Sequence, residues 1–208
     1  MDNKKKLTEA ELNERHAFKM QKKKEARDKI LATKIIEKGL IIINTGKGKG
    51  KTTAGFGIIF RAIGNGMKVG IVQFVKGKWE TGERFALDKF KEQVQFYTMG
   101  EGFTWETQSR ERDIIAAQKA WEKSKELIND DINDVVLLDE LNIVLRYNYI
   151  PIDDVLIALK NKPKHKHVII TGRNAKEELI EIADLVTNME IIKHPFRSGI
   201  KAQKGIEF

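Results

Sequence analysis

The segment LIIINTGKGKGKTT, Leu40–Thr53, restricts the fold more than any other part of the chain. A short apolar run, typical of a buried strand, leads into a glycine-rich turn and then into residues that can begin a helix. This is the context in which a phosphate-binding motif has its meaning. Glycines let successive backbone N–H groups converge on phosphate oxygens, and a helix N-terminus adds favourable partial charge. The segment therefore predicts a binding site for a nucleoside triphosphate.

The residues of this phosphate loop (residues 45–53) contribute through both backbone and side chains. Lys51 supplies a full positive charge, and the hydroxyl of Thr52 can ligate Mg²⁺. The usual spacing has a glycine where this chain has Thr45, and the glycine follows at Gly46, so the loop is a variant. The candidate ATP-binding residues in it are Thr45, Gly46, Lys47, Gly48, Lys49, Gly50, Lys51, Thr52 and Thr53.

A second apolar run, DVVLLDE at Asp134–Glu140, ends in two carboxylates. In phosphate-loop proteins such a pair holds Mg²⁺ beside the phosphates, directly or through water. Solvated acids at a strand end would give the same pattern, but its combination with the phosphate loop favours a metal site. Asn142 follows the pair and could orient it. The candidate ligands for Mg²⁺ or Mn²⁺ are Thr52, Asp139 and Glu140.

After Gly39 the chain alternates short apolar runs with amphipathic segments, the pattern of a parallel sheet with crossover helices. Six strands are predicted, at Leu40–Asn44, Lys68–Phe74, Val94–Tyr97, Asp134–Asp139, His167–Thr171 and Leu185–Ile192. Helices are predicted at Lys51–Asn65, Gly82–Phe90, Glu106–Asn129, Ile152–Asn161 and Ala175–Ala183. The expected fold class is α/β, with a mostly parallel central sheet of about six strands flanked by helices.

The N-terminal region has a different composition from the rest of the chain. Residues 1–38 carry 12 Lys or Arg against 7 Asp or Glu, and their apolar positions are sparse. Good helix formers dominate and glycine and proline are missing, which favours a charged helix. We therefore expect a basic helical N-terminal arm, residues 1–38, and one phosphate-loop domain, residues 39–208. Charged N-terminal helices are commonly solvated, so nucleic acid is not expected as a partner.

Cysteine and long apolar stretches are both missing from the sequence. Without cysteine there is no disulfide framework, thiolate metal site or cysteine nucleophile. The chemistry must come from oxygen and nitrogen groups or from the substrates themselves. No run of about 18 apolar residues could span a membrane, and the first residues lack the apolar core of a secretory signal. These features predict a cytoplasmic protein with no membrane partner.

The segment MGEGFTWETQ, Met99–Gln108, places two aromatic rings after a predicted strand. At the carboxyl end of a parallel strand this segment would face the ligand crevice. Phe103 and Trp105 could form a flat apolar wall for a large planar ligand, or they could pack into the core. The residues alone leave both possibilities open.

Six stretches of the sequence together resemble one enzyme family. They occur in order between Leu40 and Phe208 and read TGKGKGKTTAGFG, VQFVKG, GEGFTWETQ, LLDELN, VIITGR and KHPFRSGIKAQKGIEF. On these motifs the chain resembles the ATP:corrinoid adenosyltransferases of the CobA/CobO/BtuR type.

The resemblance implies a RecA-like P-loop fold and a transfer of the 5′-deoxyadenosyl group of ATP to Co(I) of a corrinoid, with release of triphosphate. It implies that ATP lies in the phosphate loop in reversed orientation. Co(I) is itself a strong nucleophile, so no general base is needed and the protein has to position C5′ and stabilise the leaving group. The resemblance also implies a homodimer, in which the arm of one subunit can cover the active site of the other, and a flavoprotein electron donor.

Residue roles follow from the same resemblance. Lys51, Thr52 and Glu140 would be the catalytic residues, with Glu140 as the metal-associated carboxylate. Arg173 would contact the nucleotide.

Phe103 and Trp105 would lie below the corrin ring and displace its lower axial ligand, which makes the cobalt easier to reduce. The C-terminal run Lys193–Phe208 is expected to fold back over the nucleotide site.

Two other functions fit the phosphate loop and the acidic pair. A RecA-type ATPase or nucleic-acid motor would release ADP and phosphate, and polynucleotide would stimulate it with steep salt dependence. A nucleotide-dependent corrinoid-binding protein would bind both ligands without turnover. The products formed from ATP therefore discriminate among the three functions.

Overall fold

The computed structural model describes residues 8–75, 81–99 and 109–207. The chain divides into two compact units, Met1–Glu37 and Lys38–Phe208. Within the first unit, helix α1 spans Glu9–Ala32. Thr8 caps it, because its hydroxyl accepts the N–H of Glu11 while the Glu11 carboxylate accepts the N–H of Thr8. None of the residues of α1 is buried, and the helix ends before Lys38, the predicted end of the arm.

The second unit is built on a six-stranded sheet. Its strands are β1 Ile41–Thr45, β2 Val69–Gln73, β3 Val94–Thr98, β4 Val135–Asp139, β5 His167–Thr171 and β6 Leu185–Asn188. They lie in the order β3-β2-β4-β5-β1-β6, and every pair of neighbours is parallel. One strand, β5, separates the phosphate-loop strand β1 from the acidic strand β4. The predicted α/β fold with a parallel sheet of about six strands is confirmed.

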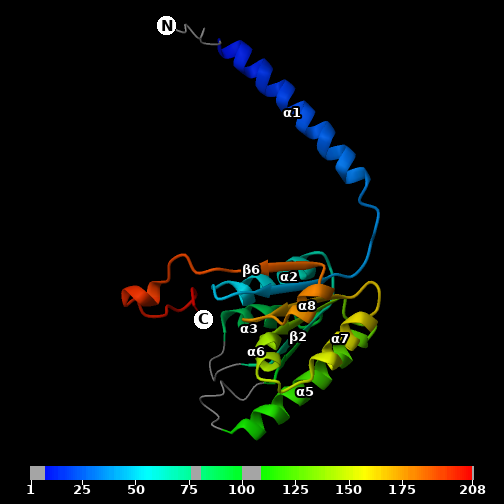
Figure 1. The fold of residues 1–208 in the computed structure, drawn as a ribbon, viewed down its shortest axis with the longest axis vertical. Coiled ribbons are helices and arrows are strands. Elements are labelled where there is room, and N and C mark those ends of the chain that lie inside the picture. The colour runs from blue at the N-terminus through cyan, green and yellow to red at the C-terminus, as the bar shows by residue number, and fades with distance from the viewer. Residues whose placement is uncertain (1–7, 76–80, 100–108, 208) are drawn as a thin grey trace. The chain divides into compact units, whose positions relative to one another are not determined.

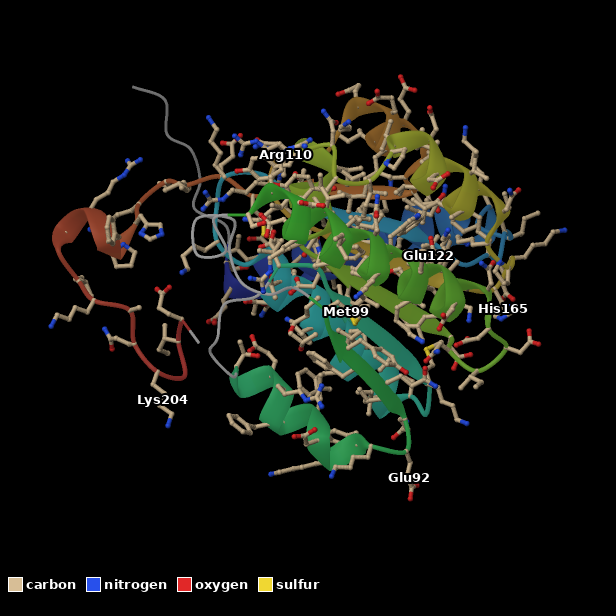
Figure 2. All side chains as sticks on the ribbon, turned by 90° about the horizontal axis from the view of Figure 1, so that it is seen from below. Glu92, Met99, Arg110, Glu122, His165 and Lys204 are labelled. Atoms are coloured by element: carbon tan, nitrogen blue, oxygen red, sulfur yellow. The ribbon has the colours of Figure 1, made fainter. Side chains whose placement is uncertain are left out.

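Helices cover both faces of the sheet (Figure 1). They are α2 Lys51–Gly64, α3 Gly82–Leu87, α5 Arg110–Asn129, α6 Leu141–Arg146, α7 Ile152–Asn161 and α8 Glu177–Ile182, with single 3₁₀ turns η1 Asp88–Phe90 and η2 Pro195–Ser198. Figure 2 shows α5 running from Arg110 past Glu122 over the sheet, with β3 ending beside Met99.

Alternate residues of the central strands enter two separate cores. Ile41 and Ile43 of β1 pack in the cluster that contains Trp121 of α5, whereas Ile42 packs in the cluster that contains Phe56 of α2. Successive side chains of a strand point to opposite faces, and both faces of this sheet are covered. Strands β1 and β4, which are buried on both faces, therefore read as continuous apolar runs in the sequence.

Several element boundaries differ from the predictions, and one helix was not predicted. Strand β6 ends at Asn188 instead of Ile192, because the carbonyl of Met189 accepts the N–H of Gly48 at 2.6 Å instead of continuing a ladder. Helix α6 was not predicted; it is a short turn directly after the acidic pair. The helix predicted at Ala175–Ala183 is shorter, at Glu177–Ile182. No helix within the described ranges is long and apolar enough to cross a membrane.

Candidate active site

The phosphate loop joins β1 to α2 at the carboxyl edge of the sheet. Gly46 and Gly50 have φ of 99° and 100°, in the left-handed region that favours glycine. A Cβ on Gly48 would lie 2.8 Å from the carbonyl oxygen of Glu190, so the loop lies directly against the chain that follows β6. Helix α2 begins directly after Gly50, and its first N–H groups form the kind of helix N-terminus that binds anions.

Two lysines of the loop make defined contacts. Lys51 is buried, and its ammonium donates to the carbonyl of Gly48. Burial lowers the pKa of Lys51, while the negative charge of Glu140 raises it. Lys49 forms an ion pair with Glu207, so the C-terminal run folds back onto the loop as expected.

The threonines of the loop have different surroundings. Thr45 is buried, and its hydroxyl accepts the N–H of Ala175 at 3.1 Å, which ties the end of β1 to the chain after β5. Thr52 lies close to Asp139, and its hydroxyl helps to lower the pKa of that carboxyl. Thr53 is exposed on the first turn of α2. The structure thus brings Thr52, and not Thr53, to the acidic pair.

Asp139 is a buried carboxylate whose oxygens are both occupied. Its Oδ1 accepts the hydroxyl of Thr171 at 2.7 Å, and its Oδ2 accepts the side-chain amide of Gln73 at 3.0 Å. Burial raises the pKa of Asp139, and the hydrogen bonds from Thr171, Gln73 and Thr52 oppose this rise. Asp139 on β4 therefore interacts with residues of β2, β5 and α2.

Glu140 has the opposite character, because one of its oxygens is buried without a hydrogen-bond partner among the described residues. Burial, and then the neighbouring charge of Asp139, raise the pKa of Glu140 to about 7, although Lys51 and Arg173 lower it. A buried carboxylate oxygen without a donor is what a cation would satisfy. Lys51, Arg173 and Asp139 all lie near enough to Glu140 for their charges to change its pKa.

Arg173 is exposed in the turn that follows β5. Its positive charge lowers the pKa of Lys51 and the pKa of Glu140, so the guanidinium lies near both side chains. A cavity of about 610 Å³ lies beside the loop. Its polar lining comes from Thr45, Gly46, Lys47, Asn174, Asn188, Glu190 and Arg197.

Phe103 and Trp105 lie outside the described residues. Their segment follows β3, whose last residue is Thr98, and the N–H of Met99 donates to the carbonyl of Gln73 at 3.1 Å. The described chain before this segment therefore ends at the carboxyl edge of the sheet, the same edge that carries the acidic pair.

A family model described as "ATP:corrinoid adenosyltransferase BtuR/CobO/CobP" matches residues 37–208. The chain belongs to this family. A second model, "Cob(I)alamin adenosyltransferase N terminal", matches residues 7–31, most of α1. The family resemblance seen in the motifs is thereby confirmed over both units of the chain.

Several relatives carry the description "Corrinoid adenosyltransferase". The protein from Sinorhizobium sp is 66% identical over 196 residues, which cover 93% of this chain and 92% of the relative. The protein from Pseudomonas aeruginosa is 47% identical, covering 95% and 98%, and that from Escherichia coli K12 is 45% identical, covering 94% and 99%. Among solved structures, the flagellar accessory protein FlaH from Methanocaldococcus jannaschii is 14% identical with a TM-score of 0.49, covering 74% of this chain and 72% of FlaH.

Two site residues escaped the sequence analysis, Gln73 and Thr171. Both are polar residues that end an otherwise apolar strand, in the motifs VQFVKG and VIITGR. That position was the available signal, because the carboxyl ends of parallel strands meet at one edge of the sheet. Their hydrogen bonds to Asp139 could not be predicted without the strand order.

Proposed function

We propose that this protein transfers the 5′-deoxyadenosyl group of ATP to Co(I) of a corrinoid and releases triphosphate. The observation that carries the proposal is the family match over residues 37–208. The matched residues include the phosphate loop and the buried acidic pair near it. In the reaction Co(I) supplies two electrons to C5′, a cobalt–carbon bond forms, and the C5′–O bond breaks. The electron pair of the broken bond leaves with the triphosphate.

The chain's main contribution is to hold the triphosphate and stabilise its developing charge. The N–H groups of the glycine-rich turn and the first turn of α2 would bind phosphate oxygens, with Lys51 beside them. Lys47 and Lys49 add positive charge at the surface of the loop. In the described structure the Lys51 ammonium already lies against the loop, and we expect it to exchange its bond to Gly48 for phosphate. The exposed Arg173 would also contact the nucleotide.

A divalent cation, Mg²⁺ or Mn²⁺, fits the acidic end of the site. No cluster of three or more His, Cys, Asp or Glu side chains that could hold a metal occurs in the part of the chain that the structure describes. A cation held by few protein ligands and by phosphate oxygens is the usual arrangement for Mg²⁺. Glu140, with its unpartnered buried oxygen, and the hydroxyl of Thr52 would hold it, and Asp139 would act beside them. When bound, the cation would neutralise charge on the leaving triphosphate.

The remaining features of the reaction come from the family resemblance. Phe103 and Trp105 are proposed to pack against the corrin ring, at the segment that follows β3. A homodimer, a flavoprotein electron donor and a cytoplasmic location stay predictions on the same ground.

The test is anaerobic incubation of the full chain with ATP, Mg²⁺ and chemically reduced cob(I)alamin, followed by absorbance. A light-sensitive cobalt–carbon product is expected, and Lys51→Ala should lose turnover. Release of ADP and phosphate without that product would favour the ATPase. Binding of ATP and corrinoid without any turnover would favour a nucleotide-dependent corrinoid-binding protein.

A further inference from the structure

The motif VIITGR ends in Arg173, and the two residues before the arginine also lie beside the acidic pair. Thr171 is the last residue of β5 and is fully buried. Its hydroxyl donates to Asp139 Oδ1 at 2.7 Å and accepts the backbone N–H of Glu140 at 2.9 Å. A single hydroxyl thus holds the side chain of one carboxylate residue and the backbone of the next.

The backbone of Glu140 requires such support. Its φ of 62° and ψ of 23° lie in the left-handed region, which residues other than glycine and asparagine avoid. A residue persists in this conformation only where its surroundings over-determine it. The conformation turns the chain from β4 into α6, and the bond to Thr171 fixes the N–H at the start of that turn.

Gly172 supports the same residue from the next position. A Cβ on Gly172 would lie 2.9 Å from Cβ of Asn142 and 3.0 Å from Oε2 of Glu140, so only glycine leaves that carboxylate oxygen room. The side-chain amide of Asn142 donates to the carbonyl of Gly172 at 3.0 Å. Residues 171–172 therefore hold the N–H of Glu140 and leave space for its Oε2, the oxygen that has no donor among the described residues.

We propose that Thr171 is a positioning residue for Glu140, whose hydroxyl sets the direction in which the unpartnered carboxylate oxygen meets the cation of a bound Mg²⁺·ATP. The inference rests on the proposed function, because it gives that oxygen a metal to bind. The three residues of one motif then act differently on Glu140. Thr171 orients its backbone, Gly172 leaves space for its carboxylate, and Arg173 places a positive charge near it. The inference predicts that loss of the hydroxyl reduces the increase in ATP affinity that Mg²⁺ causes. The affinity for ATP without Mg²⁺ should not change.

The two halves of the threonine side chain can be tested separately. The methyl group lies against α2, since a Cβ on Gly55 would be 3.2 Å from Thr171 Cγ2. Thr171→Val keeps this methyl packing and removes both hydrogen bonds, whereas Thr171→Ser keeps the hydroxyl and removes the methyl. Thr187→Val is the matched control, because Thr187 is an exposed residue near the end of β6, at the far side of the sheet from β4.

The experiment is calorimetric titration of each full-length variant with ATP, once with Mg²⁺ and once with EDTA, together with a thermal melt. We expect Mg²⁺ to strengthen ATP binding by wild type, and Thr171→Val to lose about tenfold or more of that gain. Its affinity in EDTA should stay that of wild type. Thr171→Ser and Thr187→Val should keep the gain.

Three results would overturn the inference. An undiminished Mg²⁺ gain in Thr171→Val would show that the hydroxyl does not position Glu140. An equal loss of affinity with Mg²⁺ and with EDTA would show a general structural role. A wild type without any Mg²⁺ gain would remove the proposed metal site itself, which separates failure of the proposed function from failure of the inference.

Discussion

Glu140→Gln should make the ligand-free protein more stable while it abolishes metal-dependent turnover. Burial and the charge of Asp139 raise the pKa of Glu140 from 4.5 to about 7, so the folded protein binds this proton more tightly than the unfolded chain does. The ionised carboxylate therefore costs stability. The cost is small below pH 4.5, grows as the pH rises toward 7, and is complete above that. Glutamine keeps the shape and cannot ionise.

The size of the effect follows from the same pKa values. The interval between 4.5 and about 7, at about 1.4 kcal/mol for each pH unit, corresponds to about 3 kcal/mol. Urea unfolding in EDTA without nucleotide, followed by circular dichroism, should show Glu140→Gln more stable than wild type by about this amount at pH 8, and nearly equal to it at pH 4.5. Glu178→Gln, at an exposed position of α8, is the control.

The reasoning would be refuted by a Glu140→Gln variant that is no more stable than wild type at pH 8. A stabilisation of the same size at both pH values would refute it as well, because the gain would then not come from ionisation.

Three further predictions concern single residues. Lys166→Met should lower the free energy of unfolding by about 3 kcal/mol in urea titrations, because Lys166 is fully buried and its ion-paired carboxylate would lose its partner. Gly57→Ala should stabilise α2 by about 0.5–1 kcal/mol, since an added Cβ would meet nothing within 4 Å, whereas Gly55→Ala, with Leu137 Cδ1 at 3.0 Å, should lack this gain in the same titration. Arg173→Gln removes a charge that lowers the pKa of Glu140, so Mg²⁺-dependent ATP binding, measured calorimetrically, should require a higher pH than in wild type.

The sequence was sufficient for the features that depend on local order. The positions of β1, β4 and the phosphate loop could be predicted from apolar runs that end in glycines or carboxylates. A strand that is buried on both faces has no polar residues alternating with its apolar ones, so its apolar run is easy to recognise. The edge strand β6 was predicted too long, since its last predicted residues bond to the phosphate loop at Gly48 and so depend on a distant segment. Helix α6 is only six residues long, which is too short for a helical repeat of apolar residues to be recognised.

The residues alone do not distinguish the two carboxylates, and only the family resemblance singled out Glu140. Asp139 and Glu140 are adjacent and look equivalent in the motif LLDELN. They differ because Gln73 on β2 and Thr171 on β5 both reach Asp139, which depends on β4 lying between those two strands. Strand order is a non-local property, and a left-handed φ at Glu140 has no signal in its residue type.

The most direct measurement of the central claim is a single-turnover reaction with ATP labelled with ¹³C at C5′ and reduced cob(I)alamin, followed anaerobically by ¹³C and ³¹P NMR. The account predicts that the label moves to a carbon bonded to cobalt and that triphosphate appears in equal amount. Label that stays within ADP, with phosphate as the other product, would contradict it.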